Sequence, residues 1–329
     1  MTMEEAIPAS GPFSAGQDGR GMSLLNAMYY MFKPFLPQAA RYTMRRLRAN
    51  YKLQTATDWP IMQSAGIAPP GWPGWPDGKK FALVLTHDVE GSIGLERCRQ
   101  LADLEERHGF RSSFNLIPEG EYRASPEFRE EMTARGFEIG VHDLRHDGSL
   151  YRSKKSFDEC TVAINRYLAE WNAVGFRAGF MFHNLDWLRS LHIEYDASTF
   201  DTDPFEPQPD GVGTIFPFWV DGLKPGQGYV ELPYTLPQDA TLFLVLRQND
   251  IEVWKKKTEW LVACGGMVHM NVHPDYLAFD GRLPTISEFD AGLYEEFLIH
   301  IRTTYGDQCW NALPREIGRY HRSHQPRGS

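Results

Sequence analysis

Asp88 and Glu90 stand two positions apart at the end of an apolar run, residues 81–86. If the run is a β-strand, its side chains alternate between two faces, so the two carboxylates can face the same way. Two close carboxylates repel each other. One is therefore commonly held ionised by a cation while the other keeps a raised pKa and can accept a proton. The pattern indicates one metal-binding acid and one general base, without deciding which is which.

A second segment carries two histidines, His142 and His146, directly after another apolar run. Imidazoles four residues apart lie on one face if the segment turns helically, and such pairs chelate divalent ions. The spacing alone is weak evidence, because the chain has 11 histidines. The position adds weight, since the pair closes a strand two strand–helix steps after the acidic strand end. Two unconnected surface histidines are the alternative.

Further polar residues stand at or near the ends of later predicted strands. Arg177 could clamp a carboxylate and hold it ionised, although for a lone arginine a salt bridge without a catalytic part is the favoured interpretation. Asp196 and Asp201 lie in an acidic stretch that is also typical of a capped turn. His273 ends an apolar strand immediately before a proline, a position where a lone histidine is more often structural.

The elements that must position these residues follow from the hydrophobic pattern. Apolar runs predict strands, and longer stretches with helical periodicity predict helices between them. The predicted strands are 81–86, 112–117, 137–142, 175–177, 193–197, 230–232, 241–246 and 266–272, and the predicted helices are 95–108, 125–135 and 157–173. Strand–helix–strand units of this length imply parallel pairing. We therefore expect an α/β fold, a distorted (β/α) barrel of about seven strands.

The chain divides into three predicted parts. Residues 1–20, rich in Gly, Ser, Ala and Pro, predict a disordered tail. Residues 21–75 predict a basic helical extension and a Pro/Trp linker that places Trp72 and Trp75 on the barrel wall. Residues 76–329 predict the barrel itself.

The extension is unusually basic, because no acidic residue occurs between Gly19 and Thr57. Residues 20–57 could pack on the barrel with their arginines against its acidic surface, or lie weakly on an anionic membrane surface. The first interpretation is favoured, because one short segment rarely anchors a protein stably.

Composition excludes several classes of protein. The net charge of -9 disfavours nucleic-acid binding, which needs a basic surface. Cys98, Cys160, Cys264 and Cys309 are widely scattered, which is typical of reduced thiols in a cytoplasmic protein. We find no apolar run of about 20 residues and no leader pattern. We expect a cytoplasmic protein, with the extension as the one candidate for contact with the inner face of the membrane. The sequence gives no indication of oligomeric state.

In type and chain order, these residues resemble the motifs of the polysaccharide deacetylase superfamily, the carbohydrate esterases that share the chitooligosaccharide deacetylase homology domain. The resemblance covers roughly residues 76 to 290. Asp88 matches the base of the first motif, and Glu90 matches its metal acid because Val89 replaces the usual adjacent aspartate. His142 and His146 match the second motif.

The later motifs of the family match less closely. Its Arg-x-Pro-Tyr motif is reduced here to residues 177–180, Arg-Ala-Gly-Phe. The acidic fourth motif resembles residues 195–201, and the late histidine of the fifth motif is His273.

The resemblance implies a metal-dependent hydrolase that removes an N-acetyl group from a sugar or a surface-polysaccharide precursor. Glu90, His142 and His146 would hold a divalent ion, zinc in the first place, with cobalt, nickel, manganese and iron as alternatives. Asp88, tethered by Arg177, would take a proton from water. His273, oriented by Asp196 or Asp201, would protonate the leaving amine, and the backbone N–H of Phe180 would be the oxyanion donor.

Three alternatives stay open. Asp88 and Glu90 could exchange roles at the metal. The same fold could act as an amidase or imidase on a non-sugar substrate, in some relatives without metal. The pocket could also bind glycan without any catalysis.

Overall fold

The structure is a computed structural model that describes residues 38–325, with side chains from Thr43 onward. The predicted tail and the part of the basic extension before Gln38 lie outside the described residues. Between residues 38 and 325, no helix is both long enough and apolar enough to cross a bilayer.

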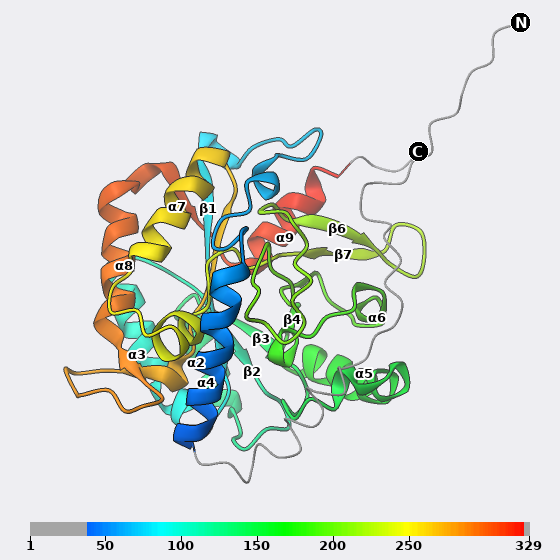
Figure 1. The fold of residues 1–329 in the computed structure, drawn as a ribbon. Coiled ribbons are helices and arrows are strands. Elements are labelled where there is room, and N and C mark those ends of the chain that lie inside the picture. Colours follow the sequence, from blue (N-terminus) through cyan, green and yellow to red (C-terminus); the bar gives the residue numbers. More distant parts are fainter. Residues whose placement is uncertain (1–37, 326–329) are drawn as a thin grey trace, which may run out of the picture.

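A single curled sheet forms the centre of the protein (Figure 1). Seven of its strands pair in parallel in the order β8-β1-β2-β3-β4-β5-β7, while β6 joins β7 antiparallel and β11 pairs with the first half of β1. The strands of this sheet are β1 (Phe81–Val89), β2 (Ser113–Leu116), β3 (Glu138–His142), β4 (Gly175–Arg177), β5 (Tyr195–Asp196), β6 (Phe218–Asp221), β7 (Gly228–Glu231), β8 (Met267–Asn271) and β11 (Cys309–Asn311). A separate pair is β9 (Leu277–Ala278) with β10 (Phe289–Asp290).

Helices cover the outside of this curled sheet, with α3, α7 and α8 on one side and α5 and α6 on the other (Figure 1). They are α3 (Ser92–His108), α4 (Pro126–Ala134), α5 (Lys154–Glu170), α6 (Leu185–Leu188), α7 (Glu252–Cys264), α8 (Ala291–Thr304) and α9 (Pro314–Ser323). The basic extension contributes α2 (Gln38–Thr55), which crosses the front of the molecule in Figure 1. It contacts η6 (Ala240–Val245) of the barrel through a hydrogen bond that Arg46 donates to a backbone carbonyl rather than to an acidic side chain.

Main-chain hydrogen bonds join the two ends of the parallel wall. After β7, the backbone N–H groups of Thr235 and Leu236 both donate to the carbonyl of His269 in β8, at 3.0 Å each. The curl of seven parallel strands and this closure confirm the predicted distorted (β/α) barrel. The linker packs on its wall, where the Trp75 indole donates to the Gly265 carbonyl at 2.9 Å and Trp72 contacts Phe216 edge-on.

The alternation of side chains along β1 explains how the barrel presents Asp88. Phe81, Leu83 and Leu85 belong to the large apolar cluster shared with α3 and α8, whereas Ala82 and Val84 belong to a separate cluster on the other face. Both faces are buried, as expected of a parallel strand covered on two sides. Even-numbered residues therefore face inward, and Asp88 extends that series to the carboxyl end of the strand.

One predicted strand is wrong. Residues 241–246 are not a strand, because Ala240–Val245 form a short π-helix, η6, and the Asp239 side chain accepts the Ala240 N–H at its start. The run is uniformly apolar and packs in the core, where Phe243 lies against Trp254 and Phe289. A short, uniformly buried run has no periodicity that distinguishes a helix from a strand.

Candidate metal centre and surrounding pocket

A cavity of about 280 Å³ lies at the carboxyl ends of the barrel strands. Asp88, Glu90, His142, His146 and His273 all line it. Its volume is close to the lower end of the range for small-molecule sites, roughly 300–1,000 Å³. The structure thus brings together side chains from the ends of β1 and β3 and from the segments that follow β1, β3 and β8, up to 185 residues apart in the sequence.

Glu90, His142 and His146 form a cluster that could hold one metal ion. One ligand atom from each of them lies within 4.8 Å of the other two. The His146 Nε2 is 3.5 Å from the Glu90 Oε1, and the two imidazole rings are 4.9 Å apart. Two imidazole nitrogens and one carboxylate oxygen are a donor set that catalytic zinc sites use.

The hydrogen bonding of His142 fits a metal ligand. Its Nδ1 lies 3.0 Å from the Arg177 carbonyl, which can only accept, so Nδ1 carries the proton. Its Nε2 is buried and has no hydrogen-bond partner among the described residues. A buried nitrogen without a partner is costly, whereas metal-bound histidines commonly donate their other ring N–H to a carbonyl. A divalent ion at Nε2 would satisfy this atom.

His146 reaches the cluster through an irregular loop. We expected a helical turn, but Asp143 and His146 adopt left-handed backbone conformations, with φ of 55° and 56°. Phe180 and Met181, in the loop after β4, do the same at 58° and 53°. Such conformations are unfavourable for residues other than glycine and cluster at functional sites. The observed turns bring the two imidazoles together, so the expected proximity holds although the expected local structure was wrong.

Gly179 lets the loop after β4 approach His146 closely. A Cβ atom at this position would lie 2.8 Å from His146 Cδ2 and 2.7 Å from Asp143 Oδ2. The next residue, Phe180, stacks its ring on the His146 imidazole at 4.4 Å. Close packing against Asp143 and His146 therefore explains why glycine stands here in place of the proline of the Arg-x-Pro-Tyr motif. The expected role of the Phe180 backbone N–H stays a prediction.

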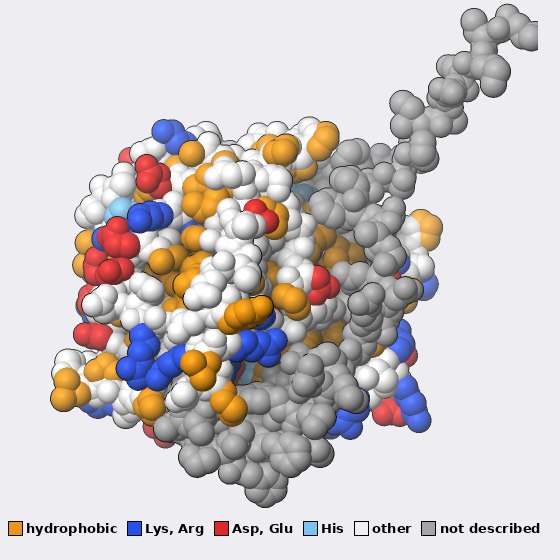
Figure 2. Space-filling view, viewed as in Figure 1, with side chains coloured by type: hydrophobic (Ala, Val, Ile, Leu, Met, Phe, Trp, Pro, Cys, Tyr) orange, Lys and Arg blue, Asp and Glu red, His pale blue; other side chains and the backbone are white. Residues whose placement is uncertain are grey.

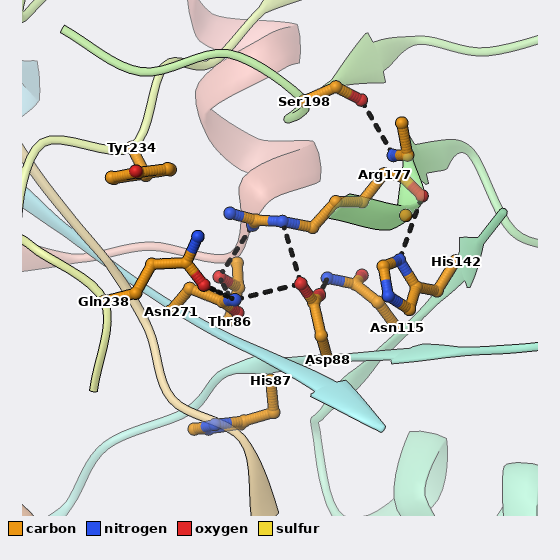
Figure 3. A network of polar contacts seen from close by, with 12 residues as sticks. Thr86, His87, Asp88, Asn115, His142, Arg177, Ser198, Tyr234, Gln238 and Asn271 are labelled. Carbon is orange, nitrogen blue, oxygen red and sulfur yellow. Dashed lines mark hydrogen bonds and ion pairs between the residues drawn. The ribbon is translucent and has the colours of Figure 1, made fainter. Parts of the chain in front are cut away.

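Asp88 is a buried carboxylate with three polar partners (Figure 3). Its Oδ1 accepts from Asn115 at 2.8 Å, its Oδ2 accepts from Asn271 at 2.9 Å, and the Arg177 Nε lies 3.1 Å from Oδ2. Burial raises the pKa of Asp88, but Arg177 and the nearby His142 and His273 outweigh burial, and the net pKa is well below the usual range. Asp88 is therefore ionised at neutral pH, and both its oxygens are already engaged.

Glu90 has one carboxylate oxygen facing the histidines. Its Oε2 accepts from the Tyr276 hydroxyl, while its Oε1 faces His146 and lies 3.9 Å from His273 Nε2. Burial raises the pKa of Glu90, but His146, His273 and the Tyr276 hydrogen bond together lower it more strongly, so the net pKa is about 2. This arrangement favours Glu90 over Asp88 as the metal acid.

Asp239 orients His273. Its Oδ1 accepts from the His273 Nδ1 and its Oδ2 accepts from the backbone N–H of His273, both at 2.7 Å. Burial lowers the pKa of His273, but Asp239 and then Glu90 raise it more strongly, to about 10. The imidazole is therefore protonated at neutral pH.

The expectation that Asp196 or Asp201 orients His273 is wrong. Both carboxylates are fully buried in other interactions. Asp196 accepts from the Ser198 hydroxyl at 2.8 Å, and that hydroxyl accepts the Ala178 N–H at 2.8 Å, which supports the loop after β4. Asp201 pairs with Lys257 at 2.8 Å. Neither acid is therefore free to turn toward His273.

Sequence reasoning also missed four polar residues of the site, Asn115, Asp239, Asn271 and Tyr276. Alternation could have found Asn271, because it stands two residues before His273 on the same apolar strand and faces the same side. Asn115 similarly lies within predicted strand 112–117. No sequence signal marks Asp239, since it precedes a segment that was predicted to be a strand.

No protein-family model and no curated protein matches this chain. Solved structures do match. A Mycobacterium smegmatis protein assigned as a polysaccharide deacetylase is 18% identical over 80% of this chain and 98% of that one, with a TM-score of 0.57. The peptidoglycan deacetylase PdaC from Bacillus subtilis is 13% identical over 76% and 95% of the two chains, with a TM-score of 0.41. The family 4 carbohydrate esterase from Streptomyces lividans, in complex with acetate, is 11% identical over 73% and 96%, with a TM-score of 0.42.

These comparisons concern the fold. The first likeness confirms that the chain shares the fold of the Mycobacterium smegmatis protein, as the motif resemblance implied. The other two have TM-scores too low to add to that conclusion.

Proposed function

We propose that this protein is a metal-dependent hydrolase that removes an N-acetyl group from a sugar or a surface-polysaccharide precursor. The observation that carries the proposal is the cluster of Glu90, His142 and His146, placed in one cavity with an ionised acid and a protonated histidine. The fold shared with a protein assigned as a polysaccharide deacetylase supports it.

The cluster would hold a divalent ion, which we propose to be zinc. When bound there, such an ion supplies a Lewis acid for the amide carbonyl and for a water molecule. Cobalt, nickel, iron and manganese remain alternatives, because imidazole and carboxylate ligands do not select strongly among them. The buried Nε2 of His142, which has no partner within residues 38–325, is the atom that most needs the ion.

Asp88 and His273 are the proposed base and acid. Asp88 is ionised and held by Arg177, so it can accept a proton from the attacking water. His273 is protonated and held by Asp239, so it can donate a proton from Nε2 to the leaving amine. Two groups whose pKa values are pushed apart in this way divide acid and base roles between them. The backbone N–H of Phe180 is the proposed donor to the developing oxyanion.

The proposal includes the location and the class of substrate. The four cysteines, all unpaired in the structure, support a reducing compartment such as the cytoplasm. The substrate is proposed to be an acetylated carbohydrate.

Acetate release tests the proposed activity. The full chain, loaded in turn with each metal, is incubated with N-acetylglucosamine, its oligomers and its glycosides, and free acetate is measured. We expect release by the wild-type protein and a loss of about 10²–10⁴-fold in the Asp88→Asn variant. Metal-loaded protein that binds these sugars but releases no acetate from any of them contradicts the proposal.

A further inference from the structure

Helix α2 forms one wall of the cavity that holds the metal cluster. Arg45, Arg48 and Lys52 line the same cavity as Glu90 and His146. Residues 45, 48 and 52 are spaced to lie on one helix face. In the view of Figure 2, basic side chains gather over the region where Figure 1 places α2. The acidic and imidazole end of the cavity thus meets a basic wall from a distant part of the chain.

Three contacts fix the rotation of α2 about its axis. The Arg46 guanidinium donates to the Leu244 carbonyl of η6 at 3.1 and 3.2 Å. Ala49 is buried, and the Lys52 ammonium donates to the Pro204 carbonyl. With these residues engaged, Arg45 and Arg48 are directed to the cavity, so their placement there follows from how the helix is held.

Arg45 and Arg48 have no acidic partner among the described residues, whereas Lys52 has neighbouring acids. Burial and then Arg48 lower the pKa of the Lys52 ammonium overall, while the carboxylates of Asp203 and Glu206 raise it. Arg48 and Lys52 are like charges four residues apart, which is an unfavourable pairing on a helix. The chain has nine more acidic than basic residues (43 against 34). Acidic side chains are therefore abundant, yet no described acid pairs with these two exposed arginines.

We infer that Arg45 and Arg48 recognise an anionic group, a phosphate or a carboxylate, on the substrate. The inference rests on the proposed function, since it takes the acetylated amide to lie at the metal cluster and the remainder of the molecule to extend toward α2. A guanidinium binds phosphate or carboxylate through two parallel hydrogen bonds, which suits both anions. A neutral sugar offers no anionic group to these guanidiniums.

Binding to the metal-free full chain tests the inference separately from catalysis. The probes are N-acetylglucosamine 1-phosphate, N-acetylmuramic acid as the carboxylate, and methyl N-acetylglucosaminide as the neutral reference. We compare the wild-type protein with Arg45→Gln/Arg48→Gln by calorimetry at low and high salt. The matched control is Lys154→Gln/Lys155→Gln on α5, which removes the same charge from an exposed helix far along the chain.

The wild-type protein and the control should bind one of the anionic sugars at least about tenfold more tightly than the methyl glycoside, because charge-assisted hydrogen bonds are strong. The preference should fall by about tenfold or more in Arg45→Gln/Arg48→Gln, and it should weaken with salt. The phosphate and carboxylate probes show which anion is recognised.

Two results overturn the inference. One is equal binding of neutral and anionic sugars, or a preference that survives in Arg45→Gln/Arg48→Gln. The other comes from co-sedimentation with vesicles of anionic lipid. If Arg45→Gln/Arg48→Gln loses binding to the vesicles and no anionic sugar is preferred by the wild-type protein, the arginines bind a lipid surface. Anionic-sugar binding without acetate release from any sugar would refute the proposed activity alone. Acetate release without preference for an anion would refute this inference alone.

Discussion

The carboxylate of Asp239 accepts two hydrogen bonds from one residue, the ring Nδ1–H and the backbone N–H of His273, each at 2.7 Å. Two contacts from one carboxylate fix the imidazole both in position and in orientation. They leave Nε2 directed toward Glu90, at 3.9 Å from its Oε1. The orientation of His273, the proposed proton donor to the leaving amine, is therefore fixed by Asp239 rather than by the acidic stretch of residues 195–201.

Asp239→Asn should lower the pKa of His273. Asp239 and Glu90 together hold that pKa at about 10 against the effect of burial, so losing one of them shifts it toward or below the ordinary 6.5. Proton NMR of the metal-free protein should show the shift, and turnover should fall by about 10²–10³-fold at neutral pH. The exposed Asp186→Asn variant on α6 is the control. An unchanged His273 titration in Asp239→Asn would show that the contact does not set the proton affinity of the ring.

Arg177→Met should destabilise the protein by about 3–5 kcal/mol, because it leaves the buried Asp88 carboxylate without its guanidinium partner. Combined with Asp88→Asn, the same change should cost less than the two single changes added together. Urea unfolding of the three variants measures the free energy. Arg99→Met, which breaks an exposed pair with Glu131, should cost less than about 1 kcal/mol. Strict additivity at Arg177 and Asp88 would refute the coupling.

Gly179→Ala should weaken metal binding by about tenfold, because the new methyl group would press on His146 at 2.8 Å. Zinc affinity of the purified variant, measured by competition with a chelator, checks this. Gly318→Ala on α9 is the matched control, since its Cβ would meet no atom closer than 3.4 Å. If both variants bind zinc as tightly as the wild-type protein, the close approach of the loop after β4 has no bearing on the metal cluster.

Glu206→Gln should change how stability depends on pH. Burial and then Asp203 raise the pKa of Glu206 to about 7 from its ordinary 4.5. Between these values the folded state holds a proton that the unfolded state releases, so stability falls as pH rises and the loss is complete above about pH 7. The glutamine can still accept from Tyr234 and Gln238, which both donate to Oε1.

Relative to the wild-type protein, Glu206→Gln should therefore be more stable at pH 8 than at pH 5, by about 2–3 kcal/mol. Urea unfolding at the two pH values measures the difference. The exposed Glu130→Gln variant on α4 is the control. A difference of the opposite sign would mean that Glu206 is ionised in the folded protein.

The sequence was sufficient to predict the barrel and the carboxylates and histidines that the structure brings together in one cavity. Side-chain alternation along β1 placed Asp88 inward, and the position of His142 at the end of β3 placed it at the same edge of the sheet. Parallel strands bring their carboxyl ends together, so neighbours in space follow once the strand order is inferred.

There is a physical reason why other residues of the site could not be predicted from the sequence. The apolar residues 241–246 were taken for a strand, and this error concealed Asp239, which precedes the π-helix that they form. Likewise, nothing in the sequence around Arg45 and Arg48 indicates which surface they face. That depends on contacts of α2 with Pro204 and Leu244, more than 150 residues away.

Anomalous diffraction from crystals of the zinc-loaded protein tests the central proposal most directly. The proposal predicts one zinc ion within about 2.0–2.2 Å of a Glu90 oxygen, the His142 Nε2 and a His146 ring nitrogen. The same peak should persist in Asp88→Asn. Imidazoles of His142 and His146 that turn away from Glu90, or an ion bound by Asp88 in place of Glu90, would contradict it.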